Sequence, residues 1–141
     1  MALIQDTDKA KVREILGRMD QPVRLVNFTQ ELECQYCRET RQLLEEVAGF
    51  SDKLTLEVHD FLLEKAKAET YKVDKIPATV LIGEMDRGIR YYGIPAGYEF
   101  ATLLEDIVMV SRGDSGLSLA SRGKLAGLKD PLHLQVYVTP T

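Results

Sequence analysis

The stretch 33-ECQYCRET-40 contains the only two cysteines of the chain, Cys34 and Cys37, with two residues between them. This C-x-x-C spacing is compatible with a redox-active dithiol, with half of a metal site, or with two inert thiols. An apolar run of strand length, 22-PVRLVNFT-29, precedes the motif, and a segment with helical spacing, 35-QYCRETRQLLEEVAGF-50, follows it. The cysteines are therefore predicted to lie where a strand passes into a helix.

A strand-to-helix junction can activate a thiol. If Cys34 occupies the helix N-cap and Cys37 lies one turn inside, the unpaired N–H groups and the positive end of the helix dipole stabilise the Cys34 thiolate. Because the thiolate is the attacking species, Cys34 becomes the candidate nucleophile and Cys37 the candidate resolving cysteine. Glu33 raises the pKa of Cys34, whereas Arg38 and Arg41 lower it. We expect the helix end to dominate and to lower this pKa moderately.

The sequence supports the other two interpretations of the motif, a metal site and two inert thiols, less well. A zinc site needs two further ligands, and the chain offers only His59, His133 and carboxylates, without a second C-x-x-C. Two inert thiols are the less favoured interpretation, because the surrounding strand-to-helix pattern fits a reactive placement of the cysteines. Both alternatives remain open at this point, but the pattern favours redox chemistry and no bound metal.

Composition limits the remaining classes of function. The chain has 141 residues, 45% of them hydrophobic and 28% charged, which indicates one globular domain with a small appendage. The net charge of −4 argues against a nucleic-acid ligand, which needs a basic face. The opening MALIQDTDKAKVREIL lacks the apolar core of a secretory signal, and no apolar run reaches the roughly 18–20 residues of a membrane span. We therefore expect a soluble, cytoplasmic protein without a membrane partner.

Periodicity and turn signals predict an α/β chain in the order α, βαβα, ββα. Beyond the segments beside the cysteines, the predicted elements are a helix at 6–19, a strand at 54–61, a helix at 62–71, strands at 78–83 and 89–93 around a hairpin turn, and a helix at 98–111. Together they define a unit over residues 1–112. Residues 113–131 are rich in Gly and Ser and predict a linker, with a short helix at 117–127. Alternating Leu134, Val136 and Val138 predict a last strand within residues 132–141.

The stretch 75-KIPAT-79 is the second chemical feature. Pro77 opens an apolar β run, where it lacks the N–H that a central ladder would use. Taken alone, it fits a trans proline at a strand start. Paired with the C-x-x-C, it resembles the corresponding position of a thioredoxin-like architecture, and that resemblance implies a cis proline packed against the cysteines, with Ile76 offering backbone groups to an extended substrate chain. Asn27 lies on the strand before the motif and cannot take up a proton, so we interpret it as a hydrogen-bonded strand residue.

Several of these stretches resemble one protein family. The C-x-x-C after the first strand, the later proline and the final hairpin and helix are similar to the thioredoxin/glutaredoxin fold. More narrowly, 34-CQYC-37, 91-YYGIPAGYEFATLLEDIVMVSRGD-114 and 135-QVYVTPT-141 resemble the glutaredoxin-like protein disulfide oxidoreductases of thermophiles, which carry two tandem thioredoxin-fold units. A related arrangement occurs at the N-terminus of flavin-dependent alkyl hydroperoxide reductase subunits.

The resemblance implies a central mixed four-stranded sheet flanked by helices and a thiol–disulfide oxidoreductase without an organic cofactor. It implies protein disulfides and dithiols as substrates, an external reductase or a small thiol as electron source, and contacts to substrate from Gln35, Tyr36, Ile76 and Pro77. The alternative is a degenerate binding module of the same fold without turnover.

The pattern of the family places a second C-x-x-C directly after its V-T-P-T strand, and the sequence ends there, at Thr141. We therefore expect residues 132–141 to be the first strand of a second unit. We also expect this strand, without its unit, to promote self-association.

Overall fold

Four strands form one mixed sheet in the order β2-β1-β3-β4 in the computed structural model, which describes residues 1–139. The elements are α1 (Asp6–Leu16), β1 (Val23–Thr29), α2 (Cys37–Ala48), β2 (Leu54–Asp60), α3 (Lys65–Thr70), β3 (Ala78–Ile82), β4 (Asp86–Tyr92), α4 (Tyr98–Arg112) and α5 (Leu119–Ala126). This α/β arrangement confirms the predicted fold class and places the C-x-x-C between β1 and α2.

The central strand β1 explains the stability of the sheet. It pairs in parallel with β2, from Val23 opposite Leu54, and antiparallel with β3, from Phe28 opposite Ala78. Because β1 has a neighbour on each side and helices on both faces, its residues 25–28 are completely buried. The β3–β4 hairpin then completes the sheet with a register shift near Ile82.

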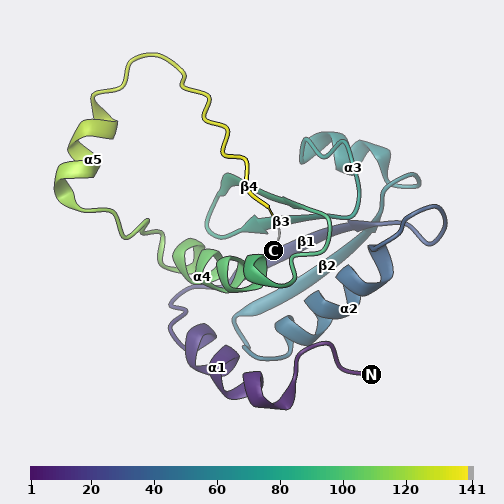
Figure 1. Cartoon of the computed structure of the whole chain (residues 1–141). Coiled ribbons are helices and arrows are strands. Elements are labelled where there is room, and N and C mark those ends of the chain that lie inside the picture. Colours follow the sequence, from purple (N-terminus) through teal and green to yellow (C-terminus); the bar gives the residue numbers. More distant parts are fainter. Residues whose placement is uncertain (140–141) are drawn as a thin grey trace.

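The helices cover the two faces of the sheet unequally. On one face α1, α2 and α4 lie side by side, and on the other α3 lies alone (Figure 1). Two apolar clusters fill the spaces between the layers. The larger one joins residues such as Leu16, Leu44 and Ile107 to Leu25 of the sheet, and the smaller one surrounds Phe28. Both clusters belong to residues 1–112.

Helix α2 begins later than the sequence predicts. Its N-cap is Tyr36, and its first intrahelical hydrogen bond runs from the Thr40 N–H to the Tyr36 carbonyl, at 2.9 Å. Residues 35–36 form a turn, so Cys37 is the first helical residue and Cys34 precedes the N-cap. The prediction of Cys34 at the N-cap and of Cys37 one turn inside is therefore wrong, because helical spacing in a sequence does not reveal a turn at the helix start.

The strand predicted within residues 132–141 is also not formed. Residues 131–139 carry neither helix nor strand, and Leu134, Val136 and Val138 are 80%, 85% and 81% exposed. A strand needs a hydrogen-bonded neighbour, and no other segment of the described chain pairs with this one. Pro140 and Thr141 lie outside the described residues. The assignments of 113–131 as a linker and of 132–141 to a second unit stay predictions.

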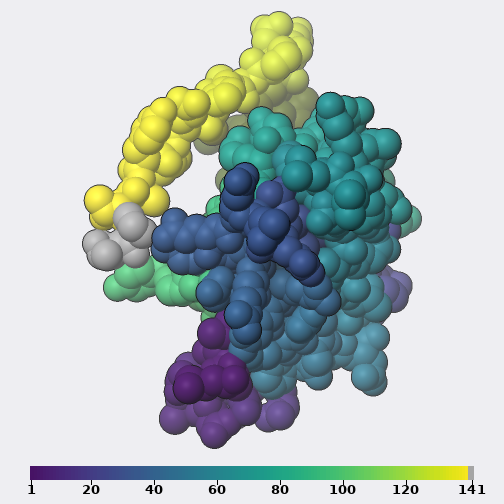
Figure 2. All heavy atoms as spheres, turned by 90° about the vertical axis from the view of Figure 1, so that its right-hand side faces the viewer, coloured from purple at the N-terminus to yellow at the C-terminus, as the bar shows by residue number. Residues whose placement is uncertain are grey.

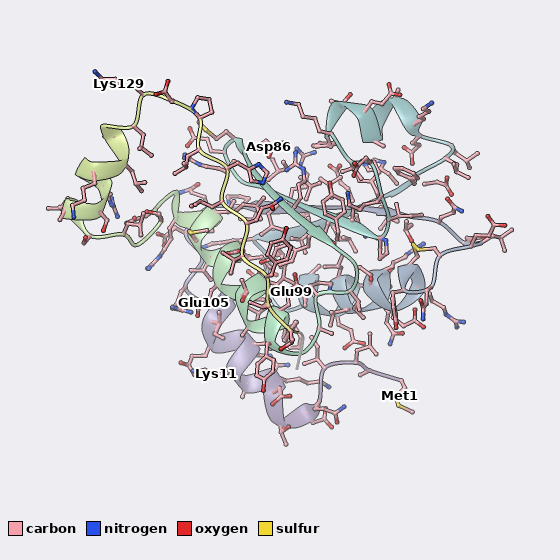
Figure 3. The ribbon with its side chains drawn as sticks, turned by 45° about the horizontal axis from the view of Figure 1, so that its top comes forward. Met1, Lys11, Asp86, Glu99, Glu105 and Lys129 are labelled. Atoms are coloured by element: carbon pink, nitrogen blue, oxygen red, sulfur yellow. A yellow bond between two sulfur atoms is a disulfide. The ribbon has the colours of Figure 1, made fainter. Side chains whose placement is uncertain are left out.

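The C-terminal segment is a separate arm of the structure. Helix α5 has no buried residue and projects beyond α4. The chain then turns back as an extended run without strand pairing (Figures 1 and 2). Figure 3 shows this run descending from Lys129 toward Glu99 at the start of α4. Val138 there lines a shallow cavity together with Ile94 and Glu99. Among the residues described, no helix has the length and apolar character that a membrane span requires.

Candidate active site

Cys34 and Cys37 are joined by a disulfide bond, and their Cα atoms lie 5.5 Å apart. The two sulfur-bearing residues differ in their surroundings. Cys34 is half-buried at the surface, whereas Cys37 is 1% exposed at the start of α2. Between them Gln35 and Tyr36 are exposed, and the Gln35 side-chain amide donates to the Tyr36 hydroxyl at 3.3 Å. An incoming nucleophile can therefore reach Cys34 and not Cys37.

The start of α2 supplies the electrostatics of the pair. No side chain caps this helix end, so the N–H groups of the first turn keep their partial positive charge beside the disulfide. Arg41 donates from its Nε to Glu45 at 2.8 Å, while Arg38 makes no ion pair within residues 1–139. The uncapped helix N-terminus thus lies beside the position where a Cys34 thiolate forms on reduction, and Arg38 and Arg41 line the same cavity as Cys34.

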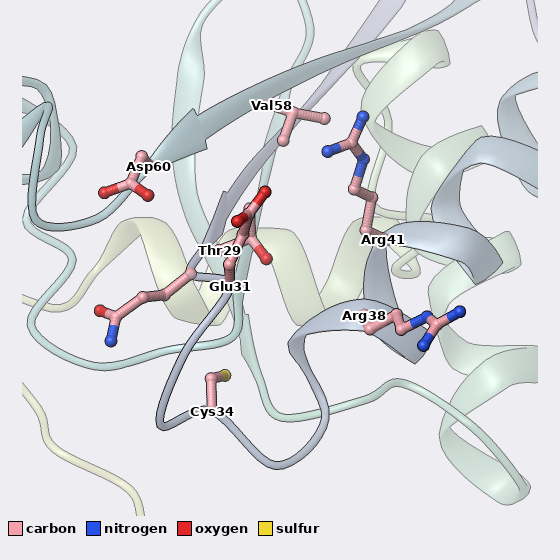
Figure 4. A pocket seen from close by; sticks show the side chains of 8 residues that line it. Thr29, Glu31, Cys34, Arg38, Arg41, Val58 and Asp60 are labelled. Carbon is pink, nitrogen blue, oxygen red and sulfur yellow. The ribbon is translucent and has the colours of Figure 1, made fainter.

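A cavity of about 490 Å³ opens beside Cys34 on the β2 side. Figure 4 shows Cys34 at one side of the cavity and the Arg41 and Asp60 side chains farther in, on different walls. Its lining residues come from the end of β1 and the loop after it, from α2 and from β2: Thr29, Gln30, Glu31, Cys34, Arg38, Arg41, Val58 and Asp60. Sequence reasoning noted the two arginines as charges, but it missed Thr29, Gln30 and Glu31. Only their position directly after the strand could have indicated them.

Pro77 lies at the same end of the sheet as the disulfide. Ala78 pairs with Phe28, so Pro77 comes level with the point where β1 ends and the chain departs toward Cys34. The Ile76–Pro77 peptide bond is cis, the isomer favoured from the sequence, and the Pro77 carbonyl accepts from the Gly93 N–H at 2.9 Å. In the described part of the chain, the Ile76 N–H and C=O make no backbone hydrogen bond. The sheet therefore does not use these two groups.

Other polar side chains near the site have structural partners. His59 lies between Glu64, at 2.9 Å from its Nδ1, and Glu57, at 3.3 Å from its Nε2, and its ring packs against Phe28. The Lys75 ammonium lies 4.6 Å from the centre of the Tyr92 ring. Asn27 is completely buried and donates from its side chain to the Ala78 carbonyl at 3.0 Å. Residues 1–139 contain no group of three or more His, Cys, Asp or Glu placed to hold a metal ion.

This order of strands, with a C-x-x-C disulfide ahead of α2 and a cis-proline ahead of β3, is that of a thioredoxin-fold protein. Comparisons with known proteins agree. No protein-family model matches the sequence. A protein disulfide oxidoreductase from Aeropyrum pernix K1 is similar in structure, with a TM-score of 0.77 and 28% identity over 89% of this chain and 55% of that one.

Two further similarities involve alkyl hydroperoxide reductases. The N-terminal domain of the alkyl hydroperoxide reductase AhpF from Enterococcus faecalis V583 has a TM-score of 0.79 and 24% identity over 89% of this chain and 61% of that one. The F component of alkyl hydroperoxide reductase from Pseudomonas aeruginosa is 24% identical over 92% of this chain and 22% of its own length. The chain therefore spans between about a fifth and three fifths of these relatives. They confirm the expected thioredoxin/glutaredoxin-like resemblance.

Proposed function

We propose that the chain is a thiol–disulfide oxidoreductase that exchanges disulfides of protein substrates through Cys34 and Cys37. One observation carries the proposal: a disulfide joins an accessible cysteine to a buried one at an uncapped helix N-terminus. The fold shared with a protein disulfide oxidoreductase supports it.

The proposed cycle starts from the reduced pair. The Cys34 thiolate attacks one sulfur of a substrate disulfide, forming a mixed disulfide and releasing one substrate thiolate. The Cys37 thiolate then attacks Cys34 Sγ, which releases the second substrate thiolate and forms the 34–37 disulfide. The substrate has gained two electrons and the pair has lost two. An external reductase or a small thiol returns them, and the reverse sequence oxidises a substrate dithiol.

Substrate is held on both sides of Cys34 in this proposal. Gln35 and Tyr36 are exposed beside the sulfur, and Tyr36 with 47% exposure offers an aromatic surface. The buried ring of Pro77 fixes Ile76, whose unpaired backbone groups suit an extended substrate chain. The chemistry needs no organic cofactor, nucleic acid or membrane, and the cytoplasm is the compartment we propose for it.

Turnover of insulin disulfides by the reduced 141-residue chain tests the proposal. We expect reduction by the intact protein, none by Cys34→Ser, and a trapped mixed disulfide with Cys37→Ser. Thr55→Val, on the exposed side of β2, is the control for substitution as such. Absence of turnover by the intact protein, combined with tight partner binding by the double Cys→Ser variant, would favour the binding module instead.

We also propose that residues 132–141 promote self-association. Leu132, Leu134, Val136 and Val138 expose large apolar side chains, and β2 and β4 are the edges of the sheet. This segment can pair with an open edge strand of a second copy. The backbone N–H and C=O groups of the two strands then form hydrogen bonds with each other. Light scattering over a concentration series would show dimers that disappear when residues 130–141 are deleted. A monomer at all concentrations, unchanged by the deletion, contradicts the proposal.

A further inference from the structure

Three buried side-chain oxygens lie without a hydrogen-bond partner in the part of the chain that the structure describes. They are Asn27 Oδ1, Thr40 Oγ1 and Thr79 Oγ1, and all three residues are 0% exposed. A buried polar atom that gives up its hydrogen bonds to water destabilises the fold, and such atoms in proteins commonly bind an internal water. Three of them in one region need a common explanation.

The topology brings the three residues together. Asn27 on β1 and Thr79 on β3 are register partners, so their side chains stand next to each other on one face of the sheet. That face carries the apolar cluster of α2, because Leu25 and Leu81, two residues from Asn27 and Thr79, belong to it. Thr40 faces it from the first turn of α2, in the buried stripe of that helix. The three oxygens therefore line the space between the sheet and the start of α2.

The resolving cysteine belongs to the same stripe. Cys37 and Thr40 are three residues apart in α2, so they share a face of the helix, and both are buried. Cys37 therefore faces the same space between α2 and the sheet as Thr40, whereas Cys34 lines the open cavity. A water molecule bound to these oxygens has hydrogens to donate to a sulfur at this position.

Four charged side chains lie on the outer side of the cysteine pair. Arg38 and Arg41 on α2, Glu31 in the loop and Asp60 on β2 line the outer cavity beside Cys34. Tyr91 on β4 is the register partner of Thr79.

The Tyr91 hydroxyl donates to Asp106, and burial together with this hydrogen bond raises the pKa of Tyr91 far above its ordinary value. Tyr91 is therefore uncharged at neutral pH, and Asn27, Thr40 and Thr79 carry no charge at all. The Cys37 thiolate can then gain stabilisation here from hydrogen bonds and not from an ion pair.

We propose that Asn27, Thr40 and Thr79 hold an internal water molecule that donates a hydrogen bond to the Cys37 thiolate and positions it for attack on Cys34. The proposal rests on the proposed function, since it concerns the resolving step of that cycle. The three residues act through the water and are positioning residues. Hydrogen bonds to a charged group are the stronger kind, so loss of this one slows resolution measurably.

One equivalent of DTNB added to the reduced protein separates the two steps. The Cys34 thiolate attacks DTNB and releases the first thionitrobenzoate, and the Cys37 thiolate then attacks Cys34 Sγ and releases the second. For Thr40→Val and Thr79→Val, which keep the shape and remove the oxygen, we expect an unchanged first release and a second release about tenfold slower. Thr55→Val, exposed on β2, should change neither rate.

Equal second-release rates in the Thr40→Val, Thr79→Val and unmodified proteins would overturn the inference. So would a higher urea midpoint of unfolding in both variants, since replacing an oxygen that has no partner by a methyl group stabilises a protein. Nuclear Overhauser transfer from water to the Asn27 side-chain amide tests the water directly, and its absence counts against it. No thionitrobenzoate release by the unmodified protein would refute the proposed function, and the water signal would still decide this inference.

Discussion

Two segments of this chain have nearly the same strand-like sequence pattern, but only one of them forms a buried strand. Residues 23–29, VRLVNFT, and residues 134–140, LQVYVTP, both carry apolar and β-branched side chains in strand order. The first is the central strand β1, with Leu25 0% exposed, whereas Leu134 in the second is 80% exposed in a run without strand pairing. β-propensity depends on packing against neighbours, and only β1 has neighbouring strands and covering helices. The comparison shows that pairing partners, and not the pattern itself, make a strand here.

The groups of the candidate active site also lie in only one of these two parts of the chain. The disulfide, the cavity beside Cys34 and the cis-proline all lie between Thr29 and Pro77, at the end of the sheet where β1 finishes. The arm formed by residues 113–139 contributes none of these groups. We call residues 1–112 the body. If this division is correct, substitutions in the body should affect activity and stability much more than matched substitutions in the arm.

The largest expected difference is in turnover. Cys34→Ser in the body should abolish reduction of insulin disulfides, because it removes the accessible nucleophile. Deletion of residues 130–141 in the arm should leave the initial rate unchanged at dilute protein. The rates are measured from the same preparations at equal concentration of folded chain. A deletion variant as inactive as Cys34→Ser would break the division.

A pair of leucines tests the same contrast in stability. Leu25→Ala removes a fully buried side chain and should lower the free energy of unfolding by about 2–5 kcal/mol. Leu134→Ala shortens an exposed side chain and should change that free energy by less than about 0.5 kcal/mol. Urea denaturation followed by circular dichroism gives both values. Comparable losses for the two variants would show that residues 132–139 are packed in solution.

Two Asp–Arg pairs extend the comparison to pH. In the β3–β4 hairpin, Arg90 bonds Asp86 at 2.6 Å and lowers the pKa of that carboxyl from 3.8 to about 2. A lowered pKa in the folded state stabilises the protein above pH 3.8, and this contribution is lost as the pH falls toward 2. Asp86→Asn should therefore lower the unfolding midpoint at pH 7, with a deficit that shrinks below pH 3.8 and vanishes only below about pH 2.

Asp114 in the arm is the matched control for Asp86. It pairs with Arg122, and its pKa is lowered mainly by a hydrogen bond from the Gly116 N–H and by the charge of Arg122. Helix α5, which carries Arg122, buries no residue, so this pair has no packed structure to support. Asp114→Asn should leave the midpoint of the body unchanged at every pH. A deficit at pH 7 equal to that of Asp86→Asn would contradict the division.

The smallest expected effect is that of removing the arm on thermal stability. Deletion of residues 130–141 removes exposed side chains only, since all the described residues among them are exposed. The unfolding midpoint of dilute protein should stay within the error of calorimetry. A clearly lower midpoint would mean that the contacts of Val138 near Ile94 and Glu99 stabilise α4.

The sequence was sufficient for the elements whose signal is local. The apolar run of β1 and the helical spacing in α2 and α4 predicted these elements to within about two residues, because β1 is buried on both faces and each of the two helices buries one face. The C-x-x-C and Pro77 were found because their residue types are rare and chemically distinctive. Their meeting at one end of the sheet followed from the fold that the resemblance implied.

The remaining features depend on contacts between distant residues. The turn at residues 35–36 places Cys34 outside α2, and no periodicity indicates it. Thr40 and Thr79 look like ordinary helix and strand residues, and only the packing of α2 on the sheet shows that their oxygens are buried without partners. The strand predicted at 132–139 is absent for a related reason. Its residues alternate as in a strand, but no neighbouring strand in the described chain pairs with them.

The redox equilibrium of the cysteine pair tests the central claim most directly. The intact chain is equilibrated in glutathione buffers of graded potential, and free thiols are counted by alkylation and mass measurement. We expect Cys34 and Cys37 to change together, in one two-electron transition, at about −120 to −270 mV, the range of known thioredoxin-fold oxidoreductases. Thiols that never form a reversible pair in this range, or that change one at a time, would contradict the account.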